Sequence, residues 1–262
     1  MMFNSVALTA TFAAAVLGAA LPVADPTVAK RDHIESLDVW QAVNATEEYS
    51  RETDDAWIKV DMKFPMTIFD KSDSTIYFSM NGLISLSKPG SERSLPSKEC
   101  TLGSSCLPES TVALNWEDLY IKPKTGSGTV TWTYHDATLR PEIREHYHMS
   151  WALCSKAASG GDGGDNGCGA GARYFNLNYF KNQPGIFHIS YSNNAVKEFH
   201  NWGVIGAQSL GSGEKMQTEL PVEAAQESHY NFDGVDYSSY SSCVIIDTIK
   251  KTTTWPKDTK DC

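Results

Sequence analysis

Two adjacent acidic residues are the first candidates for chemistry in this sequence. Glu117 and Asp118 directly follow Trp116, and a glycosidase needs two carboxyl groups about 5 to 9 Å apart that face one substrate. Neighbouring residues of a strand point to opposite faces, so this pair does not converge on a substrate by itself. Glu142, Glu145 or Asp136 would have to supply the partner carboxylate, and the sequence does not select among them. Capping of a strand-to-loop turn by Asp118 is the simpler interpretation.

Two histidines flank Tyr147 and form a second candidate site. If His146 and His148 belong to a strand, both imidazoles project from one face, at a spacing that suits copper or zinc. His135 or His188 would then supply a third ligand from a neighbouring strand. Because two solvent-facing histidines on an edge strand are the simpler alternative, the metal site is a hypothesis.

A glycine-rich stretch, residues 160–167, carries oxygen ligands of the kind that Ca²⁺ prefers. Asp162 and Asp165 supply carboxylates, and Asn166 adds an amide oxygen. Their spacing differs from that of an EF-hand loop, and a solvated connector is the simpler interpretation. No cofactor is predicted, and calcium at Asp162 and Asp165 stays an open alternative.

Sequence motifs for other chemistry are absent. There is no Gly-x-Ser-x-Gly elbow, no His-Glu-x-x-His metal motif and no phosphate-binding or dinucleotide loop. No catalytic residue is therefore assigned. The formal net charge is −10, from 32 acidic and 22 basic residues. Such a surface repels phosphate, which argues against nucleic acids and anionic membranes as partners.

Aromatic residues make up 11% of the chain and suggest contact with sugar rings, which stack on the flat faces of Tyr and Trp. Tyr237 and Tyr240, together with Trp116, Glu117 and Asp118, are the candidate ligand-binding residues. Trp116 lies within an apolar segment, so a place in the core is its simpler interpretation.

The beginning of the chain predicts secretion. Residues 1–20 contain an alanine-rich apolar run that ends in small residues, which is typical of a signal peptide. Residues 21–31 form a short pro-segment ending in Lys30-Arg31, which resembles the cleavage site of kexin-type proteases in the fungal secretory pathway. A solvated charge pair is the alternative. Residues 32–262 would form one domain with a C-terminal extension, and no transmembrane segment is predicted.

Six cysteines and one glycosylation sequon agree with this route. An even number of cysteines in a secreted chain implies disulfides, and short loops favour local pairs. The expected pairs are Cys100 with Cys106, Cys154 with Cys168, and Cys243 with Cys262. Other connectivities remain possible. Asn44, in Asn44-Ala45-Thr46, is the predicted glycosylation site.

Segments with the composition of strands recur along the chain between turn residues. Residues 57–64 alternate between apolar and polar, Pro65 is expected to end that strand, and Asn81-Gly82 predicts a tight hairpin. The other strands are predicted at 75–80, 83–86, 111–116, 129–134, 147–153, 174–180, 186–191, 202–207 and 243–247. Short helices are expected near 43–48 and 222–228. The fold class is therefore all-β, an antiparallel, jelly-roll-like β-sandwich stapled by local disulfides.

The order of these segments resembles the nidogen-like extracellular module. The likeness covers residues 57–210 and rests on Phe64-Pro65, on the strands around Asn81-Gly82 and on the apolar strand that ends in Trp116-Glu117-Asp118. Residues 187–193 and 202–208 resemble its later strands. The Cys100–Cys106 loop, the glycine-rich insert and the C-terminal segment depart from it and resemble secreted fungal β-sandwich proteins. The resemblance implies a binding or matrix-type module and carries over no catalytic residue.

These features predict a secreted, non-catalytic binding or interaction protein of the cell wall, the cell surface or a host interface, such as a glycan binder or a fungal effector. Its expected partner is an extracellular glycan or protein, and the sequence does not determine the oligomeric state. The alternative is a secreted carbohydrate-active hydrolase or lyase that uses a loop carboxylate pair, such as Glu117 with Glu142 or Glu145.

Overall fold

The computed structural model describes residues 41–44, 53–90, 95–121, 129–138, 144–156, 172–193, 203–219, 226–232 and 235–256. The chain divides into two compact units, Met1–Ser36 and Leu37–Cys262, and all described residues belong to the second. The expected signal peptide, pro-segment and dibasic pair Lys30-Arg31 lie outside them. Within the ranges above, no helix is long and apolar enough to cross a membrane.

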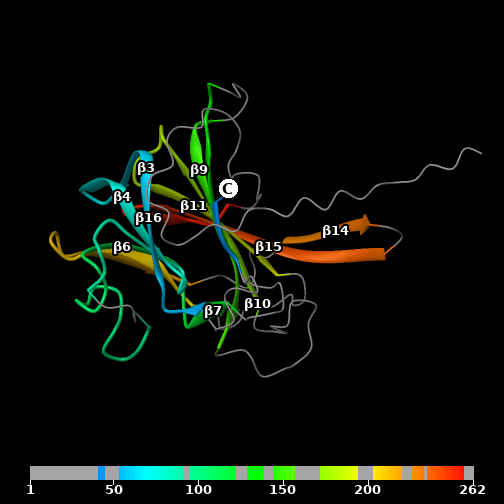
Figure 1. Cartoon of the computed structure of the whole chain (residues 1–262), viewed down its shortest axis with the longest axis horizontal. Coiled ribbons are helices and arrows are strands. Elements are labelled where there is room, and N and C mark those ends of the chain that lie inside the picture. Colours follow the sequence, from blue (N-terminus) through cyan, green and yellow to red (C-terminus); the bar gives the residue numbers. More distant parts are fainter. Residues whose placement is uncertain are drawn as a thin grey trace, which may run out of the picture. The chain divides into compact units, whose positions relative to one another are not determined.

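All regular elements in the described part of the chain are strands, arranged in two antiparallel sheets (Figure 1). Sheet A has ten strands, and its main path is β1 (Gln41–Asn44), β8 (Thr129–His135), β9 (His146–Ser155), β10 (Ala172–Phe180), β11 (Ile186–Asn193), β15 (Val235–Asp247) and β14 (Gln226–Phe232). Three short strands pair beside this path: β2 (Thr53–Asp54), β7 (Leu119–Ile121) and β16 (Thr252–Thr254).

Sheet B has six strands in the order β13 (Glu214–Thr218), β12 (Val204–Ser209), β6 (Ser110–Trp116), β5 (Leu83–Ser85), β4 (Lys71–Ser79) and β3 (Trp57–Ile68). The prediction of an all-β antiparallel sandwich is confirmed. Strands that were not predicted from the sequence are short or polar. For example, β13 is a five-residue edge strand whose sequence EKMQT shows little apolar alternation.

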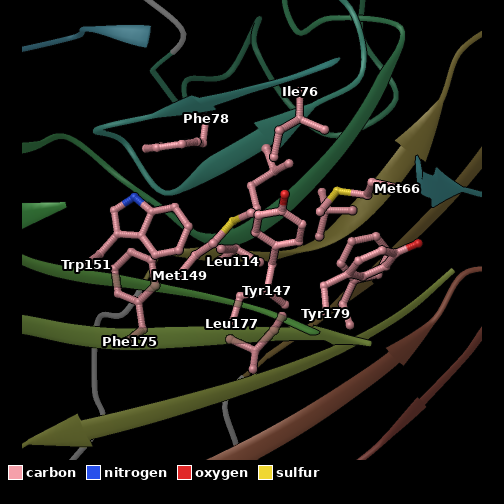
Figure 2. Close-up of a cluster of buried hydrophobic side chains, with 14 of the residues drawn as sticks. Met66, Ile76, Phe78, Leu114, Tyr147, Met149, Trp151, Phe175, Leu177 and Tyr179 are labelled. Atoms are coloured by element: carbon pink, nitrogen blue, oxygen red, sulfur yellow. The ribbon is translucent and has the colours of Figure 1, made fainter. Parts of the chain in front are cut away.

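The two sheets enclose one hydrophobic core (Figure 2). Every second side chain of β3 and β9 is buried, as the two-residue period of a strand requires. Phe78 of sheet B meets Trp151 of sheet A edge-on, with ring centroids 5.9 Å apart. The Tyr191 hydroxyl of sheet A donates a hydrogen bond to the Leu114 carbonyl of sheet B at 2.6 Å. These contacts make the sheets two layers of one sandwich.

The expectation that Pro65 ends its strand is wrong, because β3 runs on to Ile68. β3 is the edge strand of sheet B, and its pairing with β4 shifts register between Asp61 and Met66. A proline lacks an N–H group, which is tolerated at an edge and at such an irregularity.

Two tyrosines of sheet A bind the backbone of β3 from the other layer. The hydroxyls of Tyr147 and Tyr179 accept hydrogen bonds from the backbone N–H groups of Lys63 and Thr67, each at 2.7 Å. They satisfy backbone donors on a strand that has a partner strand on one side only, which is one way to protect a sheet edge.

The two short helices expected from the sequence are wrong where the structure describes those residues. The end of β1 includes Val43 and Asn44, and β14 includes residues 226–228. Short helices are marginal without tertiary packing, whereas each of these segments has a long partner strand, β8 or β15.

The predicted Asn81-Gly82 hairpin is confirmed, since it joins β4 to β5. Gly82 has φ +74°, which side chains disfavour, and a Cβ atom at this position would collide with the backbone carbonyl of Asn115. The turn thus needs glycine for its conformation and for the close approach of β6.

A second, smaller core lies against sheet B and is covered by the loop that the Cys100–Cys106 disulfide closes. It consists of Leu83, Leu102, Leu107, Ala113 and Trp116. The loop is also held by Gln208, whose side-chain oxygen accepts a hydrogen bond from the Gly103 N–H at 2.7 Å. The expected Cys100–Cys106 pair is therefore confirmed.

Cys154 and Cys243 are also disulfide-bonded. The sheet register places these two cysteines apart from each other, because Cys154 pairs with Ala172 of β10 and Cys243 pairs with Ser190 of β11. Cys168 and Cys262 lie outside the described residues, so their pairing with Cys154 and Cys243 stays a prediction.

Candidate functional site

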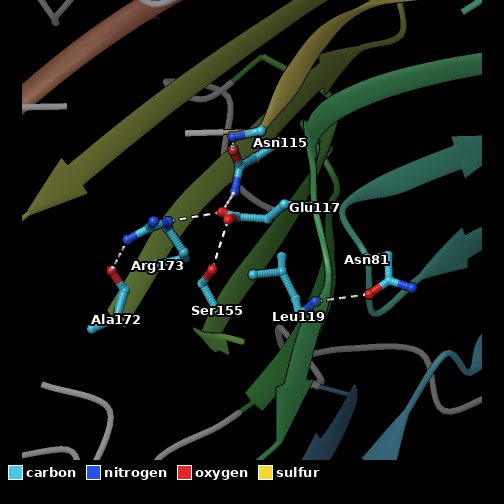
Figure 3. Close-up of polar contacts among 8 residues, drawn as sticks. Asn81, Asn115, Glu117, Leu119, Ser155, Ala172 and Arg173 are labelled. Atoms are coloured by element: carbon cyan, nitrogen blue, oxygen red, sulfur yellow. Dashed lines mark hydrogen bonds and ion pairs between the residues drawn. The ribbon is translucent and has the colours of Figure 1, made fainter. Parts of the chain in front are cut away.

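Glu117 lies immediately after β6, and its carboxylate is enclosed by polar partners (Figure 3). Arg173 of β10 donates from Nε to Glu117 Oε1 at 2.7 Å, and Asn115 Nδ2 donates to the same oxygen at 2.7 Å. Ser155 of β9 donates to Oε2, also at 2.7 Å. Glu117 is 6% exposed and Arg173 is 3% exposed, so this is a buried ion pair between the two sheets.

Each hydrogen-bond partner of Glu117 lies at or next to one end of a different strand. Asn115 precedes Trp116 in β6, and its Oδ1 accepts a hydrogen bond from the Gly203 N–H at 2.7 Å. Gly203 has no room for a side chain, because a Cβ atom there would collide with the Trp116 carbonyl. The result is a closed polar network whose function is to hold strand ends together.

Asn81 makes two further hydrogen bonds beside this network, and Figure 3 shows the one with Leu119. Asn81 Oδ1 accepts a hydrogen bond from the Leu119 N–H at 2.9 Å, and Asn81 Nδ2 donates to Asp55 Oδ1 at 2.9 Å. The amide of the hairpin asparagine thereby fixes the start of β7. Asn81 was identified from the sequence only as a turn residue.

Asp118 differs from Glu117 in its exposure. Its side chain is 33% exposed and lies 3.4 Å from Lys156 Nζ, while its backbone carbonyl accepts a hydrogen bond from the Lys156 N–H at 3.0 Å. Asp118 thus joins the β6–β7 connection to the end of β9. Capping of the turn by its side chain, through backbone N–H groups, stays a prediction.

The structure separates the predicted carboxylate partners. Glu145 precedes β9, whereas Glu117 contacts Ser155 at the end of that ten-residue strand. At the usual rise per residue the two carboxylates are roughly 30 Å apart, far beyond the separation a glycosidase uses. Glu145 instead binds Lys181 at 2.9 Å and accepts a hydrogen bond from Tyr134 at 2.7 Å. Glu142 lies outside the described residues.

The remaining candidate ligand-binding residues are Trp116, Tyr237 and Tyr240. Trp116 is fully buried in the smaller core, so its ring is not available to a ligand at the surface. Tyr237 and Tyr240 belong to β15, where Tyr237 pairs with Tyr230 and Tyr240 pairs with Glu227. Their side chains lie outside what the structure describes, so a role of these two tyrosines in binding stays a prediction.

The histidines, in contrast, are brought together by the register of sheet A. His135 pairs with His146, and their rings stack with centroids 4.4 Å apart. His148 Nδ1 lies 2.8 Å from the side-chain oxygen of Asn178, and Asn178 in turn pairs with His188. Burial, together with the neighbouring imidazoles, lowers the pKa of His146 below its usual value of 6.5.

The hypothesis of a metal at His146 and His148 gains no third ligand. Parallel stacked rings cannot direct their in-plane nitrogen lone pairs at one ion, and in the described ranges no group of three or more His, Cys, Asp or Glu residues is placed to hold a metal. Asp162 and Asp165, the calcium candidates, lie outside those ranges.

The outer face of sheet A was not identified from the sequence as a site. We define this face by the alternate residues of β9, β10 and β11 that point away from the core: His146, His148, Ser150, Ala152, Tyr174, Asn176, Asn178, Phe180, His188, Ser190 and Ser192. Ser150, Asn176 and Ser190 stand in one row across the three strands. The alternation of polar and apolar residues in 174–179 was the signal that could have predicted it.

The central row is partly exposed and uncharged. Asn176 Nδ2 lies 3.5 Å from Ser190 Oγ, and Tyr174 follows in the next row. Half-burial raises the pKa of the Tyr174 hydroxyl, which therefore stays protonated as a hydrogen-bond donor at neutral pH.

The fold and these surfaces define the chain as a disulfide-bonded, two-layer antiparallel β-sandwich protein. Comparisons with protein-family models, with curated proteins and with solved structures found no match to it. The resemblance to the nidogen-like module therefore stays a prediction from the sequence.

Proposed function

We propose that this protein is an extracellular, non-catalytic binding protein and that the outer face of sheet A contacts a glycan. The observation that carries the proposal is the row Ser150–Asn176–Ser190, with Tyr174 beside it, on adjacent strands of a broad sheet. Secretion itself, with its expected signal peptide and sequon, rests on the sequence.

The chemistry of this row suits a neutral carbohydrate. Hydroxyl and amide groups exchange hydrogen bonds with sugar hydroxyls, and a tyrosine ring offers a flat apolar surface with a polar edge. Ser150, Tyr174, Asn176 and Ser190 carry no formal charge. An uncharged ligand that covers them therefore does not have to remove water from a charged side chain.

The buried Glu117–Arg173 pair supports binding over hydrolysis. A general acid or nucleophile must reach its substrate, whereas Glu117 is 6% exposed and its oxygens accept three hydrogen bonds from neighbouring side chains. A hydrolase or lyase remains the alternative outcome of the experiment below. A location at the cell wall or a host interface, and a role as a fungal effector, belong to the same proposal.

The test is a glycan array probed with the purified secreted protein, with and without Ca²⁺, followed by affinity measurements on any glycan that binds. We expect Tyr174→Ala and Asn176→Ala each to weaken binding at least about tenfold, the equivalent of one stacking or hydrogen-bonding contact. Tyr77→Ala is the matched control, because Tyr77 is a partly exposed tyrosine of sheet B.

Three results would contradict the proposal. Release of free sugar would show a hydrolase, and release of an unsaturated sugar would show a lyase. Equal loss of affinity in the Tyr77 and Tyr174 variants would remove the outer face of sheet A as the site. Absence of any glycan that binds would remove glycans as the ligand class.

A further inference from the structure

The Asn81-Gly82 turn combines a chemically labile dipeptide with a firmly held asparagine. Asparagine is a labile residue, and a following glycine has no side chain to hinder attack of its backbone nitrogen on the asparagine carboxamide. In this protein the dipeptide joins β4 to β5, and Asn81 is fully buried there. The dipeptide thus favours a reaction that its surroundings oppose.

The reaction is deamidation through a cyclic imide. The backbone nitrogen of Gly82 loses its proton and attacks Cγ of Asn81, and the Asn81 side-chain nitrogen leaves as ammonia. Water then opens the imide at either carbonyl and gives aspartate or isoaspartate. Water is the only co-reactant, and a carboxylate replaces a neutral amide.

Hydrogen bonds hold both reacting groups away from this path. The Gly82 N–H donates to the Ser79 carbonyl at 3.2 Å, which retains the proton that the attack must release. On the side chain, Asn81 Nδ2 donates to Asp55 Oδ1 and Asn81 Oδ1 accepts from the Leu119 N–H, both at 2.9 Å (Figure 3). Ring closure would have to turn the carboxamide away from both partners.

The backbone of the dipeptide is fixed as well. The Asn81 N–H donates to Ser79 Oγ at 3.0 Å, and the Gly82 carbonyl accepts from the Leu114 N–H of β6 at 2.9 Å. Gly82 also lies against the Asn115 carbonyl, which a Cβ atom at this position would strike. Rotation of this peptide unit therefore requires the turn to leave β6.

The aspartate product does not fit the contacts that the asparagine makes. One carboxylate oxygen can still accept from the Leu119 N–H, but the oxygen that replaces Nδ2 would face Asp55 Oδ1. The contact changes from a donor with an acceptor to two acceptors of like charge. Asp55 is 9% exposed and Asn81 is fully buried, so water screens these charges poorly. Isoaspartate would also insert a methylene group into the backbone beside Gly82.

We propose that Asn81 is a latent deamidation site, which is protected while β4, β5 and β6 hold the turn and converts to aspartate or isoaspartate when this region opens. The conversion removes the hydrogen bond from Asn81 to Asp55. A molecule that has reacted is therefore less stable than before and opens more often. The site thus makes local opening of the turn an irreversible event and limits the lifetime of molecules that open there.

The first experiment incubates the unaltered protein at pH 8, in buffer and in guanidinium chloride, and follows Asn81 by mass spectrometry of its proteolytic peptide. The same dipeptide occurs at Asn166-Gly167, which serves as the reference in denaturant. We expect Asn81 to convert at about the rate of Asn166 in denaturant, and at least about tenfold more slowly than that in buffer. Equal rates at Asn81 in buffer and in denaturant would overturn the proposal, as would absence of conversion at Asn81 in denaturant.

The second experiment introduces the product directly, in Asn81→Asp, and measures urea unfolding. Asn182→Asp is the matched control, because it adds the same charge at an exposed residue in the turn after β10. We expect Asn81→Asp to lower the folding equilibrium constant at least about tenfold, and the control to change it less than about threefold. An unchanged constant in Asn81→Asp would overturn the proposal.

A substitution at Asp55 tests whether this contact is the cause of the loss. Asp55→Asn would offer an amide donor to the carboxylate at position 81, which restores a donor–acceptor contact with the roles exchanged. Asp55 has φ +55°, which asparagine also tolerates. Asn81→Asp should therefore cost less stability in the Asp55→Asn background than alone, and an equal cost would contradict the assigned contact. The first experiment needs neither a variant nor a glycan, so it decides the proposal independently of variant folding and of the proposed function.

Discussion

At the scale of single residues, the degree of burial distinguishes a carboxylate with a structural role from one that solvent can reach. Glu117 and Asp118 are neighbours in sequence, yet Glu117 is enclosed by Arg173, Asn115 and Ser155, while Asp118 is one-third exposed beside Lys156. A carboxylate whose oxygens are occupied by a guanidinium, an amide and a hydroxyl stabilises the fold and is not available for proton transfer.

Glu117→Gln should destabilise the protein by about 3 to 5 kcal/mol, because it leaves the Arg173 charge buried without its counter-charge. Urea unfolding measures this loss. The matched control is Lys59→Gln, which removes an exposed ion pair with Asp61 and should cost less than about 1 kcal/mol.

A double variant tests the assignment further. Replacing both Glu117 and Arg173 by methionine removes both charges and keeps apolar volume, so it should be considerably more stable than Glu117→Gln alone. A Glu117→Gln protein with unaltered stability would contradict the assigned role. Loss of a sugar-releasing activity in that stable variant would make Glu117 a catalytic residue.

At the scale of elements, the Cys100–Cys106 loop acts as a cover for sheet B. Leu102 of this loop and Leu107, which directly follows it, pack with Trp116 in the smaller core. Gly206 of β12 lies so close to Leu102 that a Cβ atom would clash with it. The disulfide spans six positions in sequence. It therefore acts on this loop and leaves the pairing of the strands to backbone hydrogen bonds.

Replacing Cys100 and Cys106 together by serine should cost about 2 kcal/mol, the loop-closure entropy of so short a ring. We expect faster amide exchange within residues 95–109 and a red shift of tryptophan fluorescence as Trp116 becomes hydrated. The far-UV circular dichroism spectrum should stay unaltered. A spectrum that changes throughout would show that the loop supports the whole sandwich instead.

At the scale of the whole molecule, the two sheets depend on each other. Their inner faces form one buried cluster, in which Leu114 of sheet B and Leu177 of sheet A are both fully buried. Neither sheet buries its apolar face without the other, and the tyrosine hydroxyls of sheet A also bind the edge strand of sheet B.

Leu114→Ala and Leu177→Ala should each cost about 2 to 5 kcal/mol and lower the same unfolding transition. Tryptophan fluorescence and far-UV circular dichroism should then report coincident curves for both variants. Two separate transitions, with each variant shifting only one, would show that the sheets unfold as independent layers.

Much of the fold was predictable because strand periodicity is local. The alternation in 57–64, 147–153 and 174–180 predicted three of the strands. Asn81-Gly82 predicted the turn between β4 and β5, since glycine easily adopts its positive φ. The continuation through Pro65 was not predictable, because it depends on β3 being an edge strand with a register shift.

The amino-acid sequence by itself determined the β class and the alternation that assigns inner and outer faces, and it favoured the local Cys100–Cys106 link, because each depends on residues close together in the chain. Only the tertiary structure decided which distant residues meet. Arg173 reaches Glu117 across 56 positions, and strand register sets His135 beside His146. Register is fixed by burial of a whole sheet face, so no single segment contains the information.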